Sequence, residues 1–300
     1  MNNKYLRYAA LLILSGLMCS FIILPGNRGF AAIKPGDTEV PDGEPVKSGP
    51  VEQVPWEEDE RFRDALEKSN TPVMMAAYRT VLHDPLPGEE YNVHLAAGML
   101  QGVVIKPGEV FSQNLGIGPY TEARGYRKGP TYFGSTLGTT VGGGVCKIAS
   151  TLYNVAILSN LTIVERHPHT MPVPYVPYGQ DATVAYGARD IKFSNNTPFP
   201  IMIWAQGVDN ILYMAFYGGE APPKISWHHE ILDVFQAPVI YKSNSNLGEG
   251  VENVLIEGMD GAVVKSWLTI EQPDGTVTVK NLGISRYSPM AHVVEKGTAG

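Results

Sequence analysis

Cys146 and the residues around it have the types and spacing that nucleophilic chemistry needs. The cysteine follows three consecutive glycines, Gly142, Gly143 and Gly144, and an apolar pattern at helical spacing begins directly after it. At a helix N-terminus, unpaired backbone N–H groups and the helix dipole favour a thiolate and lower the pKa of the thiol. Glycines can also turn N–H groups inward and so form an oxyanion pocket. The pattern is typical of a nucleophile, although a buried structural cysteine behind a tight turn would look the same.

A carboxylate and two imidazoles follow in the sequence ERHPH, residues 165–169. Alternate side chains of an extended segment share a face. Glu165, His167 and His169 are therefore expected to line up, and Pro168 keeps the stretch from being helical. One imidazole could deprotonate Cys146 or its incoming partner, with Glu165 fixing the tautomer. The sequence does not choose between the histidines. The same side chains are adequate zinc ligands, and polar residues on an edge strand are the third interpretation.

Three further polar residues are candidates for binding a substrate. Asp181 could orient a histidine or bind a substrate amine, and Ser112 and Asn114 could hydrogen-bond substrate amides. Each residue is also a common loop cap or turn residue. The three glycines might suggest a phosphate loop, but no Gly-Lys-Ser/Thr follows them, which argues against nucleotide binding.

The composition and the N-terminal residues limit the classes to which this protein can belong. The 300 residues are 44% apolar and 18% charged, as in a globular protein, and a net charge of -7 argues against a nucleic-acid partner. Lys4 and Arg7 precede an apolar run, residues 9–24, and Gly29-Phe30-Ala31 offers a cleavage site, which predicts a secretory signal over residues 1–31. The run is short for a membrane span, although an uncleaved anchor is the alternative.

Export would change how many cysteines the mature protein keeps and what a remaining thiol is for. Cleavage after Ala31 would remove Cys19 and leave Cys146 as the only thiol in an oxidising compartment. Such a cysteine is either an inert buried residue or a thiol kept for its reactivity.

The remaining patterns predict an α+β fold followed by a small all-β module. Residues 32–55 are rich in proline and glycine and form a linker. Residues 56–222 mix helical and strand patterns, with a central helix against a β-sheet and two strands expected within residues 180–193. Residues 231–297 show short strand patterns, with Asp260-Gly261 and Asp274-Gly275 as hairpin signals.

An ordered series of motifs resembles the VanW domain over about residues 74 to 205. The motifs are PGEVFSxN (107–114), GGGVC (142–146), STLYN (150–154), ERHPH (165–169), YVP (175–177) and DATV (181–184). The tail is similar to the small β "G-five" module that often follows such domains, through EGxDG (257–261) and YSP (287–289).

The resemblance implies a secreted or cell-envelope bacterial protein and, from some clostridial relatives, 3-3 crosslinking of peptidoglycan by a cysteine L,D-transpeptidase. Cys146 matches the family's cysteine, and His167 and His169 match its histidine pair, whereas Lys147 stands where a glutamine is usual and Ala149 where a serine is usual. The expected partners are peptidoglycan stem peptides, with no cofactor, no metal and no nucleic acid, and with a membrane tether through an uncleaved N-terminal segment as a possibility. A zinc-dependent envelope peptidase or amidase and a non-catalytic peptidoglycan-binding protein are the alternatives.

Overall fold

The computed structural model describes residues 46–299 apart from residues 83–84 and 134–135. The predicted signal, residues 1–31, and residues 32–45 of the predicted linker lie outside the described residues. Among the residues described, no helix has both the length and the apolar character that a membrane span requires.

A five-stranded antiparallel sheet is the centre of the first part of the chain. Its strand order is β1 (Gly49–Pro50), β2 (Val73–Val81), β10 (Ile211–Gly218), β9 (Ile201–Val208) and β3 (Val103–Ile105). The start of β9 is a continuous apolar run, and all of those residues are buried. Such a run, rather than an alternation of apolar and polar residues, is expected for a strand that is covered on both faces.

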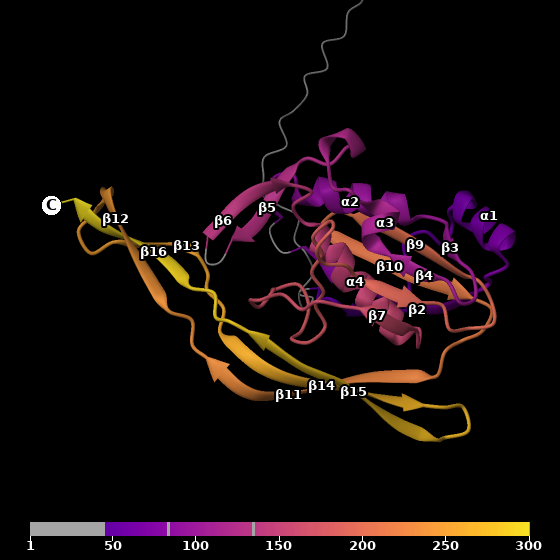
Figure 1. The fold of residues 1–300 in the computed structure, drawn as a ribbon. Coiled ribbons are helices and arrows are strands. Elements are labelled where there is room, and N and C mark those ends of the chain that lie inside the picture. Colours follow the sequence, from indigo (N-terminus) through magenta and orange to yellow (C-terminus); the bar gives the residue numbers. More distant parts are fainter. Residues whose placement is uncertain (1–45, 83–84, 134–135, 300) are drawn as a thin grey trace, which may run out of the picture. The chain divides into compact units, whose positions relative to one another are not determined.

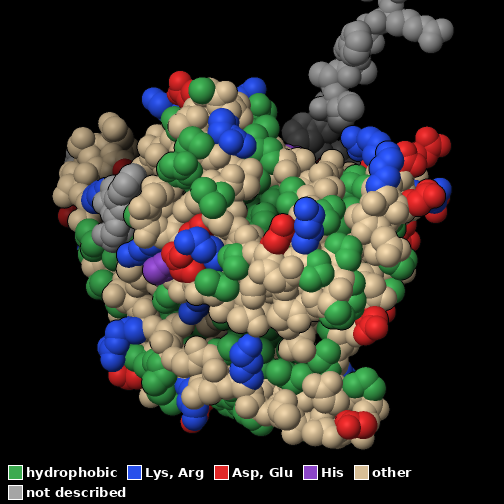
Figure 2. Space-filling view, turned by 45° about the vertical axis from the view of Figure 1, so that its right-hand side comes forward, with side chains coloured by type: hydrophobic (Ala, Val, Ile, Leu, Met, Phe, Trp, Pro, Cys, Tyr) green, Lys and Arg blue, Asp and Glu red, His purple; other side chains and the backbone are tan. Residues whose placement is uncertain are grey.

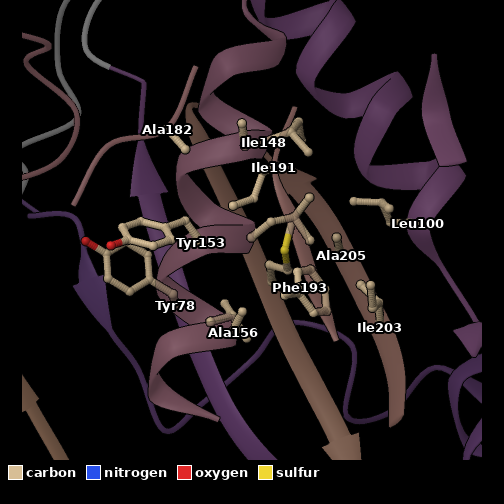
Figure 3. Packing of buried hydrophobic residues seen from close by; sticks show 14 of the residues in the cluster. Tyr78, Leu100, Ile148, Tyr153, Ala156, Ala182, Ile191, Phe193, Ile203 and Ala205 are labelled. Atoms are coloured by element: carbon tan, nitrogen blue, oxygen red, sulfur yellow. The ribbon is translucent and has the colours of Figure 1, made fainter. Parts of the chain in front are cut away.

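Helices cover both faces of this sheet (Figure 1). The helices α2 (Glu89–Leu100) and α4 (Val145–Leu158) pack on one face, and their apolar side chains meet those of β9 in the main core (Figure 3). On the other face, α1 (Glu60–Ser69) buries Phe62 against Trp204 and Tyr217. Because α4 is anchored along its length by this core, its N-terminal turn has a fixed position.

Shorter elements surround the start of α4. A three-stranded sheet has the order β4 (Val110–Ser112), β8 (Lys192–Ser194) and β7 (Thr162–Glu165), and β4 runs into α3 (Gln113–Ile117). A 3-10 turn, η1 (Glu122–Arg124), comes before the hairpin of β5 (Lys128–Phe133) and β6 (Thr136–Val141). The hairpin returns the chain to the three glycines, and so to Cys146.

The tail consists of two three-stranded sheets. The first has the order β11 (Lys224–Phe235), β14 (Gly261–Glu271) and β15 (Val277–Tyr287), all antiparallel. The second has the order β12 (Val239–Gly248), β16 (His292–Ala299) and β13 (Glu252–Ile256), with β12 and β16 parallel. The structure thus confirms an α+β fold followed by all-β sheets.

Three local predictions differ from the structure. The end of the predicted linker, residues 32–55, belongs to the fold, because Gly49–Pro50 form strand β1 against β2, and Val51 and Val54 pack against the core under α1. The two strands expected within residues 180–193 are largely absent, since only residues 192 and 193 belong to a strand there. Asp274-Gly275 does turn β14 into β15, but Asp260-Gly261 forms no hairpin, because β13 and β14 belong to different sheets. Gly261 instead lies where a side chain would collide with the carbonyl oxygen of Tyr287 and with Pro289, so close backbone approach explains the glycine.

On the face that Figure 2 shows, lysine and arginine side chains are interspersed with aspartate and glutamate. This mixture differs from the continuous basic stripe typical of nucleic-acid-binding faces.

The buried face of α4 gives a stability prediction. Leu152 is 0% exposed in the main core, so Leu152→Ala is expected to lower the free energy of unfolding by about 2–5 kcal/mol. The matched control is Leu115→Ala, at a leucine that is 81% exposed, with an expected change within about 0.5 kcal/mol. Denaturant titration followed by circular dichroism measures both variants. Equal effects of the two substitutions would contradict the assigned packing of α4.

Candidate active site

Two glycines fix the turn that places Cys146 in the first turn of α4. Gly144, the residue before the helix, has φ +104°, a conformation that other residues rarely adopt. Gly143 packs against the backbone of Gly129 with no room for a Cβ atom. Larger residues at either position would move the start of α4, and with it the sulfur of Cys146.

The same turn has two backbone N–H groups available. Gly142, Gly143, Val145 and Lys147 each donate a backbone N–H to a carbonyl oxygen. Within the described residues, the N–H groups of Gly144 and Cys146 have no acceptor. Unpaired donors at a helix start attract negative charge, so an anion or oxyanion could be bound here.

The sulfur of Cys146 is half-buried and lies among polar partners. It is 3.4 Å from the Thr183 hydroxyl and 3.7 Å from the carbonyl oxygen of Val184. The imidazole of His169 is near enough to lower the pKa of the thiol. Cys146 also packs against the main core, but the polar partners of its sulfur distinguish it from an inert cysteine enclosed by apolar side chains alone.

His169 is held in turn by Asp181. The Asp181 Oδ2 atom accepts from Nδ1 of His169 at 2.7 Å and from the backbone N–H of His169 at 2.6 Å. With Nδ1 engaged, Nε2 is the ring nitrogen left for Cys146, and the Tyr175 hydroxyl is 3.5 Å from Nε2. A thiol, an imidazole and an orienting carboxylate therefore form a chain in the order that activated nucleophiles use.

Polar residues of α4 hold the segment that carries Asp181. Ser150 exchanges hydrogen bonds with the backbone N–H and C=O of Ala182, and the Asn154 amide donates to the carbonyl oxygen of Gln180. The next residue, Thr183, donates its N–H to the carbonyl oxygen of His167. These contacts satisfy the backbone of residues 180–183 without a sheet, which explains why the expected strands do not form there.

The electrostatics of the site favour an ionised Cys146 thiol beside a protonated His169 imidazole. Burial raises the pKa of Cys146, but the hydrogen bond from His169 and the charge of its imidazolium lower it more, to about 7. Burial lowers the pKa of His169, while the Asp181 and Cys146 partners raise it more, to about 9. Because the thiol titrates below the imidazolium, the thiolate–imidazolium pair is the predominant form between these two pH values.

Asp181 stays ionised although it is only 1% exposed. Burial raises the pKa of its carboxyl, yet the hydrogen bonds from His169 and the charge of Arg166 outweigh that effect and hold the pKa below its usual range. Arg166 donates to Oδ1 of Asp181 at 2.9 Å. A buried carboxylate that is paired in this way is a stable acceptor for the imidazolium.

The structure separates the two histidines predicted at the site. Nε2 of His167 lies 3.0 Å from Glu165 Oε1, and the other oxygen of Glu165 accepts from Lys192 at 2.7 Å. Glu165 is therefore next to His167, whereas the carboxylate next to His169 is Asp181. Of the common face expected for residues 165, 167 and 169, Glu165 and His167 do lie together, but His169 pairs with Asp181 instead, beyond the end of β7 at Glu165.

Ser112 and Asn114, two predicted substrate contacts, bond to the loop before β8. The Ser112 hydroxyl donates to Asp190 at 2.5 Å and accepts from the N–H of Leu115, which caps α3. Asn114 donates its backbone N–H to Asp190 and its side-chain amide to the carbonyl oxygen of Arg189. Within the described residues, both side chains thus link α3 to residues 189–190.

Several residues of the site had no role in the sequence prediction. They are Thr183 beside the sulfur, Tyr175 beside the imidazole and Arg166 beside the carboxylate. All three lie within the motifs that carry the family resemblance, which was the available signal. Lys147 forms an ion pair with Glu89 and lies 4.7 Å from the centre of the Tyr175 ring, so the charge of this lysine is neutralised locally.

In the part of the chain that the structure describes, no group of three or more histidine, cysteine, aspartate or glutamate residues is arranged to hold a metal ion. The zinc interpretation therefore has no ligand set among these residues.

Comparison with known proteins gives one family and two related sequences. Residues 88–217 match the family described as VanW like protein. The chain is 35% identical over 146 residues to the uncharacterized protein YoaR of Bacillus subtilis, across 49% of this chain and 48% of that protein. It is 35% identical over 119 residues to the vancomycin B-type resistance protein VanW of Enterococcus faecalis, across 38% of this chain and 43% of that protein. The chain thus spans less than half the length of these curated relatives.

Two solved structures are also similar to a quarter of the chain. The IgA1 protease G5 domain covers 26% of this chain and 94% of its own length, with 24% identity and a TM-score of 0.17. The G5 domain of HP0197 covers 25% of this chain and 99% of its own length, with 17% identity and a TM-score of 0.15.

The site gives a pH prediction. Iodoacetamide alkylation of Cys146 is expected to rise with pH with a midpoint near the pKa of about 7, because only the thiolate reacts. Removal of the imidazolium in His169→Ala should move the midpoint to or above the ordinary thiol value of about 8.5, and slow alkylation at pH 7 roughly tenfold or more.

Mass spectrometry of the peptide that contains Cys146 measures the rate without interference from Cys19. The control is His167→Ala, which should leave the midpoint unchanged because His167 pairs with Glu165. A wild-type midpoint at 8.5 or above would contradict the ion pair.

Proposed function

Since residues 88–217 form a VanW-like domain, we propose that this protein is a cell-envelope enzyme that acts on peptidoglycan through a Cys146 nucleophile. The observation that carries the proposal is the chain from Cys146 to His169 to Asp181. An ionised thiol, an imidazolium next to it and a buried carboxylate behind the ring are the parts that acyl transfer through a thioester requires. The name of the Enterococcus relative, a vancomycin-resistance protein, supports a role at the cell wall.

The first half of the proposed reaction forms a thioester. The Cys146 thiolate attacks the carbonyl carbon of the third residue of a stem tetrapeptide, and the N–H groups of Gly144 and Cys146 bind the oxyanion. When the tetrahedral intermediate collapses, the C–N bond to the terminal D-residue breaks. His169 gives its proton to the leaving amine, so the terminal residue departs as a neutral amine and the imidazole becomes neutral.

The second half transfers the acyl group to another stem peptide. A side-chain amine of the second stem attacks the thioester carbonyl, and neutral His169 takes the proton that the amine loses. The C–S bond then breaks, which restores the thiolate and the imidazolium and leaves a new amide, the 3-3 crosslink. Asp181 keeps the ring oriented through both halves and stabilises the imidazolium without taking its proton.

The proposal places the other predicted features around this reaction. Residues 1–31 serve as an export signal or as an uncleaved membrane tether, and the part of the predicted linker that precedes β1 acts as a spacer outside the cytoplasm. Residues 56–222 contain the reactive site, and residues 231–297 form the β module that packs against it. The reaction needs no cofactor, because the chain from Cys146 to Asp181 supplies nucleophile, acid and base. A non-catalytic peptidoglycan-binding protein is the competing function, and the half-buried Cys146 thiol, whose pKa His169 lowers to about 7, favours the enzyme.

Crosslinking should depend on the sulfur of Cys146. In the full chain, Cys146→Ala is expected to abolish formation of 3-3 crosslinked dimers from purified stem tetrapeptides, measured by chromatography and mass spectrometry. Cys19→Ala is the matched control and should retain full activity. Full activity of Cys146→Ala would end the proposal. Undiminished binding to isolated peptidoglycan, with no dimers from the wild type, would instead identify a binding protein.

The two histidines should differ in their effect on the same reaction. His169→Ala is expected to lower the crosslinking rate by about 10²–10⁴, because the proton donor and acceptor is lost. His167→Ala removes the partner of Glu165 and should change the rate less than about threefold, a difference of under 1 kcal/mol in the barrier. Initial rates under saturating substrate decide the point. The reverse ranking would assign the proton transfers to His167.

A further inference from the structure

Two side chains of the C-terminal strand β15 reach the residues that hold His169. Ser285 and Tyr287 are alternate residues of β15 and therefore lie on the same face of the strand. The Ser285 hydroxyl accepts from Arg166 Nη1 at 3.0 Å, and the Tyr287 hydroxyl donates to Asp181 Oδ1 at 2.5 Å. The β module thus contacts the charged pair behind the imidazole.

The Tyr287 hydroxyl is buried and both donates and accepts a hydrogen bond in this contact. The residue is 1% exposed, and its hydroxyl also accepts from the N–H of Gly179 at 2.8 Å. Burial raises the pKa of Tyr287 far above the usual range, and the charge of Asp181 raises it further, so the hydroxyl stays protonated and remains a donor.

Asp181 divides its two oxygens between different partners. Oδ1 accepts from Arg166 and from Tyr287, while Oδ2 accepts from the backbone N–H and from Nδ1 of His169. Two donors on Oδ1 set the rotation of the carboxylate about its own bond, and that rotation decides whether Oδ2 faces the imidazole. The orientation of the ring therefore depends on a residue of the β module.

We propose that Tyr287 is a positioning residue for His169, and that the C-terminal β module is for this reason a structural part of the reactive site. The inference rests on the proposed function of Cys146 and extends it. Tyr287 is too far along the chain from the proposed nucleophile to be suspected from a local motif, and it acts through Asp181 without contact to a substrate.

The surrounding charges determine the direction of the expected effect. The titratable and charged groups around the Asp181–His169 pair are Cys146 and Tyr153 of α4, Arg166 and Tyr175 of the segment after β7, Tyr287 of β15 and, beside Tyr175, Glu89 of α2. Asp181 is ionised throughout the titration of Cys146, so loss of the Tyr287 hydroxyl changes geometry rather than net charge. A poorly oriented imidazolium stabilises the thiolate less, and the pKa of Cys146 should rise.

The test is the pH dependence of Cys146 alkylation in the full chain with Tyr287→Phe. The ring is kept and only the hydroxyl is removed, so the expected result is an upward shift of the midpoint by roughly half a unit to one unit. Circular dichroism and thermal unfolding show whether the variant is folded. Should it fail to fold, Ser285→Ala tests the same link through Arg166, with a smaller upward shift expected.

Tyr178→Phe is the matched control. Its hydroxyl donates to the carbonyl oxygen of Asp260 at 2.8 Å, and its ring centre lies 5.3 Å from that of Tyr287, so it belongs to the same contact region without touching Asp181. An unchanged midpoint in Tyr178→Phe supports positioning. Equal shifts in both variants would show that Tyr287 only anchors the module and would overturn the inference.

A double variant isolates the path through Asp181. In an Asp181→Asn background, Tyr287→Phe should no longer shift the midpoint, because the acceptor that it orients has been changed. A persistent shift would place the effect elsewhere. Different results would contradict the two proposals. A wild-type alkylation midpoint at or above about 8.5 would contradict the role of Cys146 as a nucleophile. A low wild-type midpoint that does not shift in Tyr287→Phe would contradict only the positioning role of Tyr287.

Discussion

The interaction on which the rest of the site depends is the bond between the buried carboxylate of Asp181 and the imidazole of His169. A carboxylate that is 1% exposed is costly to bury unless donors compensate it. Here four donors do so, two from His169, one from Arg166 and one from Tyr287. The same hydrogen bonds also fix the orientation of the imidazole. Because Nδ1 of His169 is bonded to Asp181, Nε2 is the ring nitrogen that remains for the sulfur of Cys146.

The helix α4 connects this electrostatic arrangement to the core. One face buries Leu152 and its neighbours against the sheet, and another carries Ser150 and Asn154, which fasten the segment of Asp181. The first turn of the same helix carries Cys146. The nucleophile and the loop that carries the orienting carboxylate are therefore both held by one rigid helix, which limits how far they can move relative to each other.

The motifs shared with VanW-like proteins divide into supporting and reactive residues. Ser112 and Asn114 fasten α3 to the loop at Asp190, and Glu165 connects His167 to Lys192, so these motif residues support neighbouring elements. Lys147 is paired with Glu89 and therefore adds no unbalanced charge beside the thiolate. The second group surrounds the Cys146 sulfur and includes Thr183, His169 and Asp181.

Local patterns were enough to predict the α+β class, the all-β tail and the cysteine at a helix start, because hydrophobic period, glycine and helix polarity act within a few neighbouring residues. The tertiary structure decided which histidine meets Cys146, why residues 180–184 form no strand, and that Tyr287 reaches Asp181 from 106 positions away. Such contacts depend on how distant segments dock. Burial then makes each polar group find a partner, and no local pattern states which partner that will be.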